Sequence, residues 1–330
     1  MAQHGNETTG GGARAATPLS FELFPPRTDA AAIALGRTID RLVDVDPAFI
    51  SVTFGAGGSS RDRSLTVLRY ILEQTDVEPM AHLTCVGSSH AEANDLVRRF
   101  LDAGIRSFLA LRGDLPDGAD PDAPLGDLGT AAELVQLIHR VQQEREPFQE
   151  VEVPGNPGAS RIRERARDTR VAVATFPNGH PRSRDLDQDV DILLAKEAAG
   201  ANLAITQLFW VADDYLTFVE RARTGGVTIP ILPGIMPTTS PARLARLTEL
   251  TGVQAPAEFA IALEIEPDAT GRTDIGIAFA TDLAAEVLAG GAPGLHLYTY
   301  NRHEAVLDVV DRLGLAPNPQ TTNERNVTRR

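Results

Sequence analysis

The sequence predicts an α/β protein, a (β/α)8 or TIM barrel in a single domain, and three observations carry that prediction. From Pro18 onward, short apolar runs rich in β-formers alternate with longer runs of helical periodicity, as in parallel β/α units. Eight such units are present, and a helical run follows the last strand. No GxGxxG motif follows any predicted strand, so an open dinucleotide-binding sheet lacks its fingerprint.

The predicted strands are short apolar runs bounded by polar, glycine or proline residues. They are residues 18–24, 48–54, 79–85, 106–112, 170–176, 203–209, 229–235 and 294–299. The predicted helices are amphipathic and lie between these strands and after the last one. They are residues 30–44, 62–74, 90–103, 129–143, 185–199, 212–224, 240–250, 273–289 and 302–313.

Four of the predicted helices carry a start signal, a side chain able to accept a hydrogen bond from the first turn. Asp29 precedes the first helix and Ser89 the third. Ser240 is followed by Pro241, which is favoured at the first helical position. Asn301 precedes the last helix.

Residues 17–315 form the predicted barrel, between polar tails at 1–16 and 316–330 that we expect to be disordered. Residues 144–169, rich in proline, glycine and arginine, have no helical or strand periodicity. They predict a surface insertion before strand five, either a hairpin or an oligomer contact. We expect a homo-oligomer.

Composition excludes several classes of protein. Of 330 residues, 42% are hydrophobic and 23% charged, as in a globular chain, and the net charge of −14 disfavours nucleic acid and anionic membranes as partners. No apolar run approaches the roughly 20 residues of a membrane span, and no signal peptide is recognisable, so we expect a cytoplasmic protein. The single cysteine, Cys85, forms no internal disulfide, and the absence of HxH and HExxH predicts no metal site.

Lys196 is the only lysine, against 30 arginines. Where either cation suffices, drift toward arginine has replaced lysine, whereas a site that needs a compact ammonium resists the change. Lys196 is therefore a candidate functional residue, although survival by chance explains a single lysine equally well. It lies seven residues after Asp189, on the same face of a predicted helix.

Glu22 is flanked by Phe21, Leu23 and Phe24 near the end of the first strand. An apolar environment raises the pKa of a carboxyl group, which suits a general acid at neutral pH. The alternative is a structural ion pair with an arginine of a neighbouring strand.

Other polar residues gather at the carboxyl ends of predicted strands, where barrels build their active sites. They are Thr53, Arg112, Asp114, His180, Gln207, Tyr298 and Arg302, and Gly113, between Arg112 and Asp114, lets the backbone approach a ligand closely. His82 lies within strand three, and a histidine in that position is more often a satisfied core residue than a ligand.

Nine ordered stretches resemble the bacterial, single-domain 5,10-methylenetetrahydrofolate reductases. They are SFELFPP (20–26), SVTFGAGGSSRDRS (51–64), AHLTC (81–85), LALRGDLP (109–116), FPNGHP (176–181), KEAAGAN (196–202), ITQLF (205–209), PILPGIMP (230–237) and YTYNR (298–302). The resemblance covers about residues 18–315 and implies a (β/α)8 barrel that binds FAD non-covalently at the strand ends.

The resemblance also implies roles for individual residues. Glu22 would protonate N10 of the folate and open its ring, and the reduced flavin would deliver hydride to the resulting iminium carbon. Asp114 would lie between flavin and pterin, and Gln207 and Arg302 would contact the folate. FAD contacts are implied for Thr53, His82, Arg112, Gly113, Asp114, Thr130, Ala131, Phe176, His180, Asp189 and Lys196. NADH or NADPH would reduce the flavin and leave before the folate binds.

The chain departs from the family pattern at three positions. Thr130 and Phe176 stand where the family usually has tyrosines, and Pro241 stands where an aromatic usually packs on the nicotinamide or the folate. Each change removes stacking or a hydrogen bond worth about 1 kcal/mol, which predicts loosely bound FAD.

Two other functions stay open on the sequence. A flavin-free barrel lyase or aldolase acting on an anionic substrate would use Glu22 as acid and Lys196 as Schiff-base nucleophile, although Lys196 lies on a helix rather than at a strand end. A non-catalytic flavoprotein or scaffold is the other alternative. The colour of the purified protein and folate-dependent flavin reoxidation distinguish the three.

Overall fold

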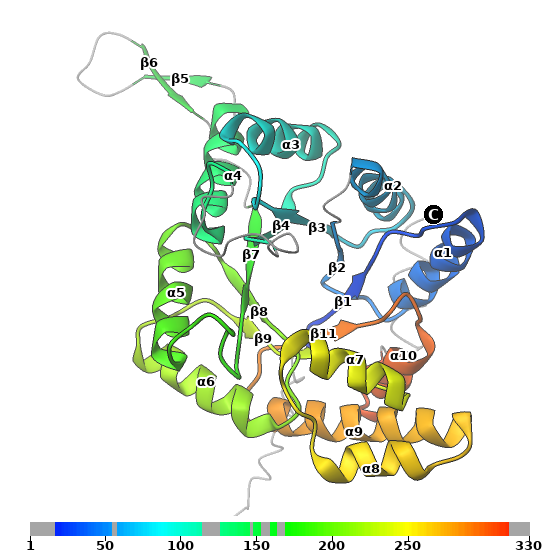
Figure 1. Ribbon diagram of the computed structural model, residues 1–330. Helices are drawn as coiled ribbons and strands as arrows, with labels where there is room; N and C mark the ends of the chain where they lie inside the picture. Colours follow the sequence, from blue (N-terminus) through cyan, green and yellow to red (C-terminus); the bar gives the residue numbers. More distant parts are fainter. Residues whose placement is uncertain are drawn as a thin grey trace, which may run out of the picture.

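The computed structural model describes residues 17–54, 58–113, 126–145, 148–152, 159–163 and 169–316. Parallel strands form the centre and helices surround them (Figure 1). The strands are β1 (Leu19–Leu23), β2 (Phe49–Val52), β3 (Pro79–Thr84), β4 (Ser107–Leu111), β7 (Arg170–Thr175), β8 (Leu203–Thr206), β9 (Ile231–Leu232), β10 (Gly234–Ile235) and β11 (Leu295–Tyr298). Every one of them lies inside a range predicted from the sequence.

The sheet closes through a strand that is interrupted at Pro233. Proline has no N–H for the ladder, so β9 and β10 are the two halves of one strand. β9 pairs with β8, β10 pairs with β11, and β11 pairs with β1, all in parallel. The ring therefore has eight parallel strands with helices outside it, and the predicted (β/α)8 fold is confirmed.

The helices follow the predicted order, with one addition. They are α1 (Asp29–Val43), α2 (Gly58–Gln74), α3 (His90–Asp102), α4 (Ala131–Arg145), α5 (Leu186–Ala198), α6 (Ala212–Thr224), α7 (Pro241–Thr251), α8 (Ala257–Ile265), α9 (Ala269–Ala289) and α10 (Glu304–Arg312). The sequence did not predict α8, because its residues AEFAIALEI are apolar on nearly every face and show no helical period. None of the described helices is long and apolar enough to cross a membrane.

Two of the four predicted N-caps are confirmed and two are wrong. Ser89 and Ser240 accept hydrogen bonds from the first turns of α3 and α7. The cap of α1 is Thr28, whose hydroxyl accepts from the N–H of Ala31, while Asp29 lies in the first turn. Asn301 does not cap α10, because its side chain is bonded to backbone elsewhere.

Two apolar layers hold the barrel together. One lies between the strands and the helices, and the other fills the barrel interior. The interior layer consists of Phe49, Met80, Leu109, Ala172, Leu203, Ile205 and Leu232. Beyond this interior layer, toward the carboxyl ends of the strands, the inward-facing residues are polar; they include Glu22, His82 and His296.

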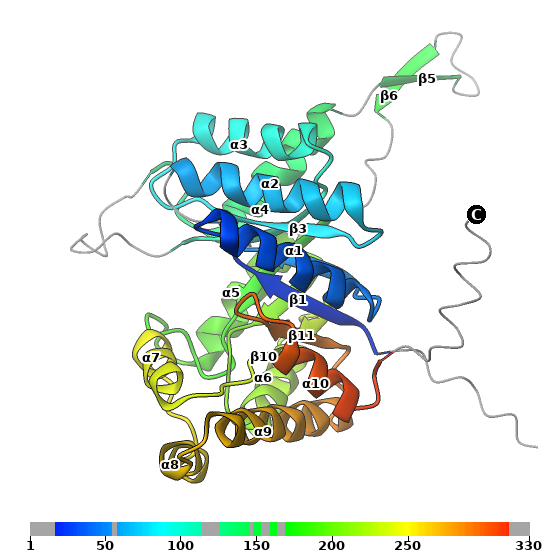
Figure 2. The same ribbon diagram turned by 90° about the vertical axis from the view of Figure 1, so that its right-hand side faces the viewer.

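The insertion contains an antiparallel hairpin of β5 (Phe148–Glu152) and β6 (Ala159–Arg163), which confirms the hairpin expectation. Because it lies in the connection from α4 to β7, it stands at the amino ends of the strands, away from α7 (Figure 2). The predicted tails lie outside the described residues, apart from Ala316.

Candidate active site

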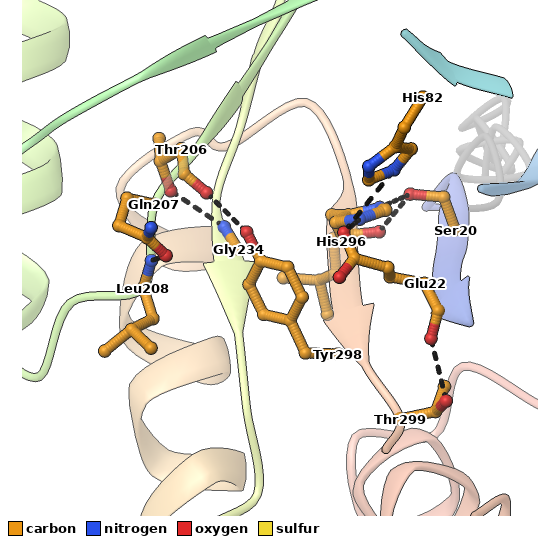
Figure 3. A network of polar contacts seen from close by, with 11 residues as sticks. Ser20, Glu22, His82, Thr206, Gln207, Leu208, Gly234, His296, Tyr298 and Thr299 are labelled. Atoms are coloured by element: carbon orange, nitrogen blue, oxygen red, sulfur yellow. Dashed lines mark hydrogen bonds and ion pairs between the residues drawn. The ribbon is translucent and has the colours of Figure 1, made fainter. Parts of the chain in front are cut away.

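Glu22 lies in β1 with its side chain inside the barrel. Phe21 and Leu23 pack into the layer under the helices, so the alternation of the strand turns Ser20 and Glu22 inward. The Oε2 atom of Glu22 lies 3.6 Å from Nε2 of His82 on β3 and 3.9 Å from Nε2 of His296 on β11 (Figure 3). The predicted alternative of an arginine partner is wrong, since the ion-pairing groups near Glu22 in the described structure are these histidines.

Ser20 sets the protonation pattern of His296, a fully buried residue. The Ser20 hydroxyl donates its one proton to the carbonyl oxygen of Leu295 at 3.1 Å and lies 2.8 Å from Nδ1 of His296. We therefore assign a proton to Nδ1, which donates to Ser20 Oγ. The other ring nitrogen, Nε2, faces the carboxyl group of Glu22, with 3.9 Å between Nε2 and Oε2.

The expected rise in the pKa of Glu22 is wrong. Burial does raise the pKa of this carboxyl group, but its interaction with His296 and the positive charges that His82 and His296 can carry outweigh burial, so its pKa is lowered. The sequence showed the apolar neighbours along β1 but not the two histidines across the barrel. Burial lowers the pKa of His82, and Glu22 opposes that effect only in part.

Three buried polar atoms around Glu22 have no hydrogen-bond partner within the described residues: Ser51 Oγ, His82 Nε2 and His296 Nε2. Ser51 is the register neighbour of Glu22 on β2. Unsatisfied buried atoms are rare in native proteins and need an explanation such as a catalytic role or a bound group. The polar layer around Glu22 is therefore suited to proton transfer rather than to packing alone.

Gln207 follows β8 at the barrel mouth, which is the end of the barrel formed by the carboxyl ends of the strands. It lies across this mouth from Glu22 (Figure 3). Its Oε1 accepts a hydrogen bond of 2.9 Å from the N–H of Leu208, and within the described part of the chain its NH2 group has no acceptor, so it can donate to a ligand. The preceding residue, Thr206, is held through its carbonyl by the hydroxyl of Tyr298. The structure thus brings Glu22, Gln207 and Tyr298 together at one end of the barrel, and His82, which the sequence placed within strand three, lies beside Glu22 there.

A second polar group surrounds the end of β7 and the start of α5. Asp189 is buried and accepts hydrogen bonds from the N–H of His180 at 3.0 Å and from Ser183 Oγ at 2.8 Å. The ring of Phe176 meets that of His180 edge to face, with centroids 4.7 Å apart. Because Asp189 is held by the loop that it organises, its role in the described structure is to fix His180.

Lys196 lies on the inner side of α5, and its Nζ donates to the carbonyl oxygen of Ala174 at 2.8 Å. Burial lowers the pKa of Lys196 to about 8, although the charge of Asp189 opposes that shift. Asp189 and Lys196 lie on one helix, α5, as the sequence predicted. Among the described residues this is the one hydrogen bond of the ammonium, so two of its N–H groups can bind an anion.

The remaining predicted residues lie in the loops after β2 and β4 and at the start of α4. Gly113 has φ +93°, and a Cβ there would lie 2.6 Å from Val86 Cγ1, so that position requires glycine. Thr130 caps α4: its hydroxyl accepts from the N–H of Glu133, whose carboxylate accepts from the N–H of Thr130. Thr53 follows β2, Arg112 follows β4, Ala131 begins α4 and Arg302 is exposed after β11. Asp114 lies outside the described residues.

Sequence reasoning did not include Ser20 and His296 among the candidate residues. A signal was present, because SFELF and LHLY each alternate polar and apolar residues, the pattern of a strand with one polar face. Polar residues on the inward face of a barrel strand near its carboxyl end are site candidates, and this rule would have selected both.

Comparisons with known proteins agree with this geometry. Residues 12–314 match the family described as methylenetetrahydrofolate reductase. The chain is 33% identical over 300 residues to a 5,10-methylenetetrahydrofolate reductase of Salmonella typhimurium and 32% identical to one of Escherichia coli, with 91% of each chain covered. A rice protein described as a probable methylenetetrahydrofolate reductase (NADH) is 34% identical over 91% of this chain and 48% of its own.

Among solved structures, a Clostridium thermocellum protein described as binding two copies of 5-methyl-5,6,7,8-tetrahydrofolic acid superposes with a TM-score of 0.58 at 12% identity. It covers 91% of this chain and 96% of its own, and at this identity the likeness supports the barrel fold. The family match over nearly the whole chain, and the polar mouth of the barrel that the matched strands build, lead to one conclusion: the chain is an oxidoreductase that belongs to the methylenetetrahydrofolate reductase family.

Proposed function

We propose that this protein reduces 5,10-methylenetetrahydrofolate to 5-methyltetrahydrofolate, using non-covalently bound FAD and either NADH or NADPH as the reductant. The observation that carries the proposal is the placement of Glu22 at the barrel mouth against two buried histidines. We infer further that it acts in the cytoplasm as a homo-oligomer, and that its product supplies methyl groups for methionine synthesis.

The residues around β4, β7 and α5 fit a flavin dinucleotide. The charges of Arg112 and Lys196 both act on His180, so these three groups converge on one region at the strand ends. The diphosphate of FAD needs such cations and donors, and the backbone at Gly113 allows close approach. We assign further FAD contacts to Thr53, His82, Asp114, Thr130, Ala131, Phe176 and Asp189. Bound FAD would carry hydride from the nicotinamide to the folate carbon.

Glu22 is the proposed general acid toward N10 of the folate. Because its pKa is lowered, Glu22 is ionised at neutral pH when no ligand is bound. The proton that it delivers must therefore come from a neighbouring group. His296 is that neighbour, because Ser20 orients its Nε2 toward the carboxyl group. Burial lowers the pKa of His82, and the charge of Glu22 opposes that shift only in part, so His82 holds a proton less readily than a free imidazole does.

Binding of the folate is assigned to residues on both sides of the mouth. The free NH2 group of Gln207 can donate to an acceptor of the pterin ring. Arg302 is exposed after β11 and supplies a cation for the carboxylates of the folate. Asp114 is proposed to lie between the flavin and the pterin, where a carboxylate influences both.

An anaerobic two-step experiment tests the proposal. The purified protein is loaded with FAD and reduced with NADH or NADPH, and flavin bleaching is followed at its visible absorption band. Methylenetetrahydrofolate is then added, and both flavin reoxidation and 5-methyltetrahydrofolate are measured. Colour that does not return on folate addition would reject the proposal in favour of a non-catalytic flavoprotein. Failure to bind FAD would reject flavin chemistry.

A further inference from the structure

A cavity of about 340 Å³ lies outside the barrel, between helices α1 and α2, which are neighbours on its outer surface (Figures 1 and 2). We call it the α1–α2 cavity. Its apolar part is formed by Leu35 and Ile39 of α1 and Val67 of α2, which are buried, and the ring of Tyr70 stands beside them, half exposed. A volume of this size accommodates a small organic molecule. None of its lining residues belongs to the site around Glu22.

The charged side chains of the cavity are mainly cationic. Arg27, just before α1, and Arg63, near the start of α2, both line it, and within the described residues neither has a hydrogen-bond or ion-pair partner. The lining contains one acid, Asp29 in the first turn of α1. The chain as a whole has a net charge of −14, so two unpaired guanidinium groups at one cavity are a local exception. They favour an anionic ligand, since guanidinium groups bind carboxylates and phosphates strongly.

Gly36 keeps the cavity open. It lies in the interior of α1, where glycine is less favourable than alanine. The atom nearest to a Cβ at this position would be the hydroxyl oxygen of Tyr70, at 3.8 Å, which is an ordinary contact. Neither packing nor the backbone conformation of α1 therefore requires a glycine here. A larger side chain would instead occupy the space in front of Tyr70, so the open cavity is the feature that depends on Gly36.

Both helices that line the cavity are connected to strand ends at the barrel mouth. The hydroxyl of Ser64 on α2 donates to the carbonyl oxygen of Thr53 at 2.8 Å, and the N–H of Thr53 donates to the carbonyl oxygen of Leu23 at 2.8 Å. Leu23 is the residue after Glu22. On the α1 side, Pro26 lines the cavity and is only four residues after Glu22. A molecule bound between the helices therefore contacts the segments that hold the end of β1 in place.

We propose that the α1–α2 cavity binds a small effector that has a flat apolar body and one phosphate or carboxylate group. The apolar body lies on Leu35, Ile39 and Val67, and the anionic group lies between Arg27 and Arg63. Binding of the effector changes the rate of the folate step, in which Glu22 acts. The binding site itself is independent of the proposed function, whereas the rate effect rests on it.

Calorimetry with three probes tests the binding site. Phenyl phosphate, phenol and inorganic phosphate are titrated into protein saturated with FAD and 5-methyltetrahydrofolate, so that the flavin and folate sites are filled. Phenyl phosphate is expected to bind at least about tenfold more tightly than either fragment. Arg63→Gln is expected to weaken phenyl phosphate about tenfold, equivalent to about 1.4 kcal/mol. Arg69→Gln is the matched control, because Arg69 is exposed on the same helix and does not line the cavity; it is expected to change the affinity less than about twofold.

Gly36→Leu fills the cavity without removing a charge. It is expected to weaken phenyl phosphate more than tenfold while the melting temperature is unchanged or higher, because leucine favours the helix over glycine. Stopped-flow absorbance then measures reoxidation of the reduced flavin by methylenetetrahydrofolate with and without phenyl phosphate. The probe is expected to change this rate at least about twofold in the wild type and to leave it unchanged in Gly36→Leu.

Each contrary result rejects a defined part of the proposal. Absence of phenyl phosphate binding, or binding that neither Arg63→Gln nor Gly36→Leu weakens, would overturn the site. A folate step that is unchanged when the cavity is occupied would overturn the role as an effector site. A wild-type dimer that becomes a monomer in Gly36→Leu, measured by light scattering, would show that a second copy of the chain occupies the cavity instead. Phenyl phosphate binding as expected in a protein without any folate step would overturn the proposed function and not the binding site.

Discussion

The hydroxyl of Tyr298 at the end of β11 donates a hydrogen bond of 2.9 Å to the carbonyl oxygen of Thr206 at the end of β8, across the strand that contains Gly234. The N–H of Gly234 donates to Thr206 Oγ1 at 2.8 Å, so the three strand ends are tied together. A Cβ at Gly234 would lie 2.4 Å from the Thr206 carbonyl and 2.8 Å from the Tyr298 ring. This contact fixes Gln207, the next residue, relative to Glu22.

Tyr298→Phe tests that contact. The variant leaves a buried carbonyl without its donor, so the free energy of unfolding should fall by about 1 kcal/mol, and folate affinity should fall because Gln207 is less firmly placed. Urea unfolding and 5-methyltetrahydrofolate titration measure the two effects. Gly234→Ala should be more destabilising, since backbone has to move. If Tyr298→Phe changes neither quantity, the link has no role in positioning.

Glu22→Gln should slow reoxidation of the reduced flavin by the folate by about 10²-fold or more, because the amide supplies no acidic proton. Reduction of the flavin by the nicotinamide should persist. Stopped-flow absorbance resolves the two half-reactions. Ser20→Ala is the companion variant: it removes the acceptor that fixes the His296 tautomer and should slow only the folate step, by less than Glu22→Gln does. A Glu22→Gln protein with a near wild-type folate step would show that another group is the acid.

FAD affinity should depend on pH through Lys196. Its pKa of about 8 lies below the ordinary 10.5, so the ammonium is present at pH 7 and is largely lost by pH 9, and FAD should bind more weakly as pH rises through 8. Stability of the FAD-free protein should move the other way between pH 8 and 10.5, because there the unfolded chain binds the extra proton. FAD titrations at several pH values check the first point. The Lys196→Arg variant should bind FAD more weakly than the wild type at pH 7, but its FAD affinity should not change with pH. If FAD affinity falls equally steeply with pH in both proteins, Lys196 is not the group responsible.

Flavin content after extensive dialysis should be substoichiometric in the wild type, because Thr130 and Phe176 supply no tyrosine contacts. Restoring both tyrosines should improve FAD affinity about tenfold to thirtyfold if each contact is worth about 1 kcal/mol. Phe176→Tyr is the cleaner single variant, since Thr130→Tyr also removes the N-cap of α4. The ratio of flavin absorbance to protein absorbance is the measurement. A wild-type ratio that stays near one would mean that other contacts compensate.

Asn301 should be more important to stability than an exposed loop residue usually is. Asn301→Ala loses both hydrogen bonds to Phe24 and places a Cβ in the left-handed region without a compensating side chain, so unfolding free energy should fall by about 2 kcal/mol. Asn301→Gly loses the same hydrogen bonds but tolerates the backbone conformation, and it should be the less destabilised of the two. Thermal melts compare them. Equal stabilities would show that backbone strain is not a factor at this turn.

The sequence by itself determined the (β/α)8 fold, because each strand and nearly every helix can be recognised from its own pattern of apolar and polar residues. The eight strands lie within their predicted ranges, and the capping serines of α3 and α7 follow from local hydrogen-bonding chemistry. Three site residues could also be identified from the sequence: Glu22 and Gln207 because they lie near the carboxyl ends of barrel strands, and Lys196 because it is a single lysine among arginines. Helix α8 could not be predicted from the sequence, because a segment that is apolar on nearly all sides has no hydrophobic periodicity.

Only the tertiary structure decided the electrostatics of the site. The pKa of Glu22 depends on His82 and His296, which come from strands 60 and 274 residues away and meet it only when the ring closes. Local neighbours predicted a raised pKa, and the cross-barrel neighbours reverse that direction. The cation–π contact of Arg243 with Tyr300 and the hydrogen bonds of Asn301 with Phe24 also join residues that are far apart in the sequence and meet only in the folded barrel. Local sequence encodes secondary structure and burial, whereas a charge responds to every group within several ångströms, whichever part of the chain supplies it.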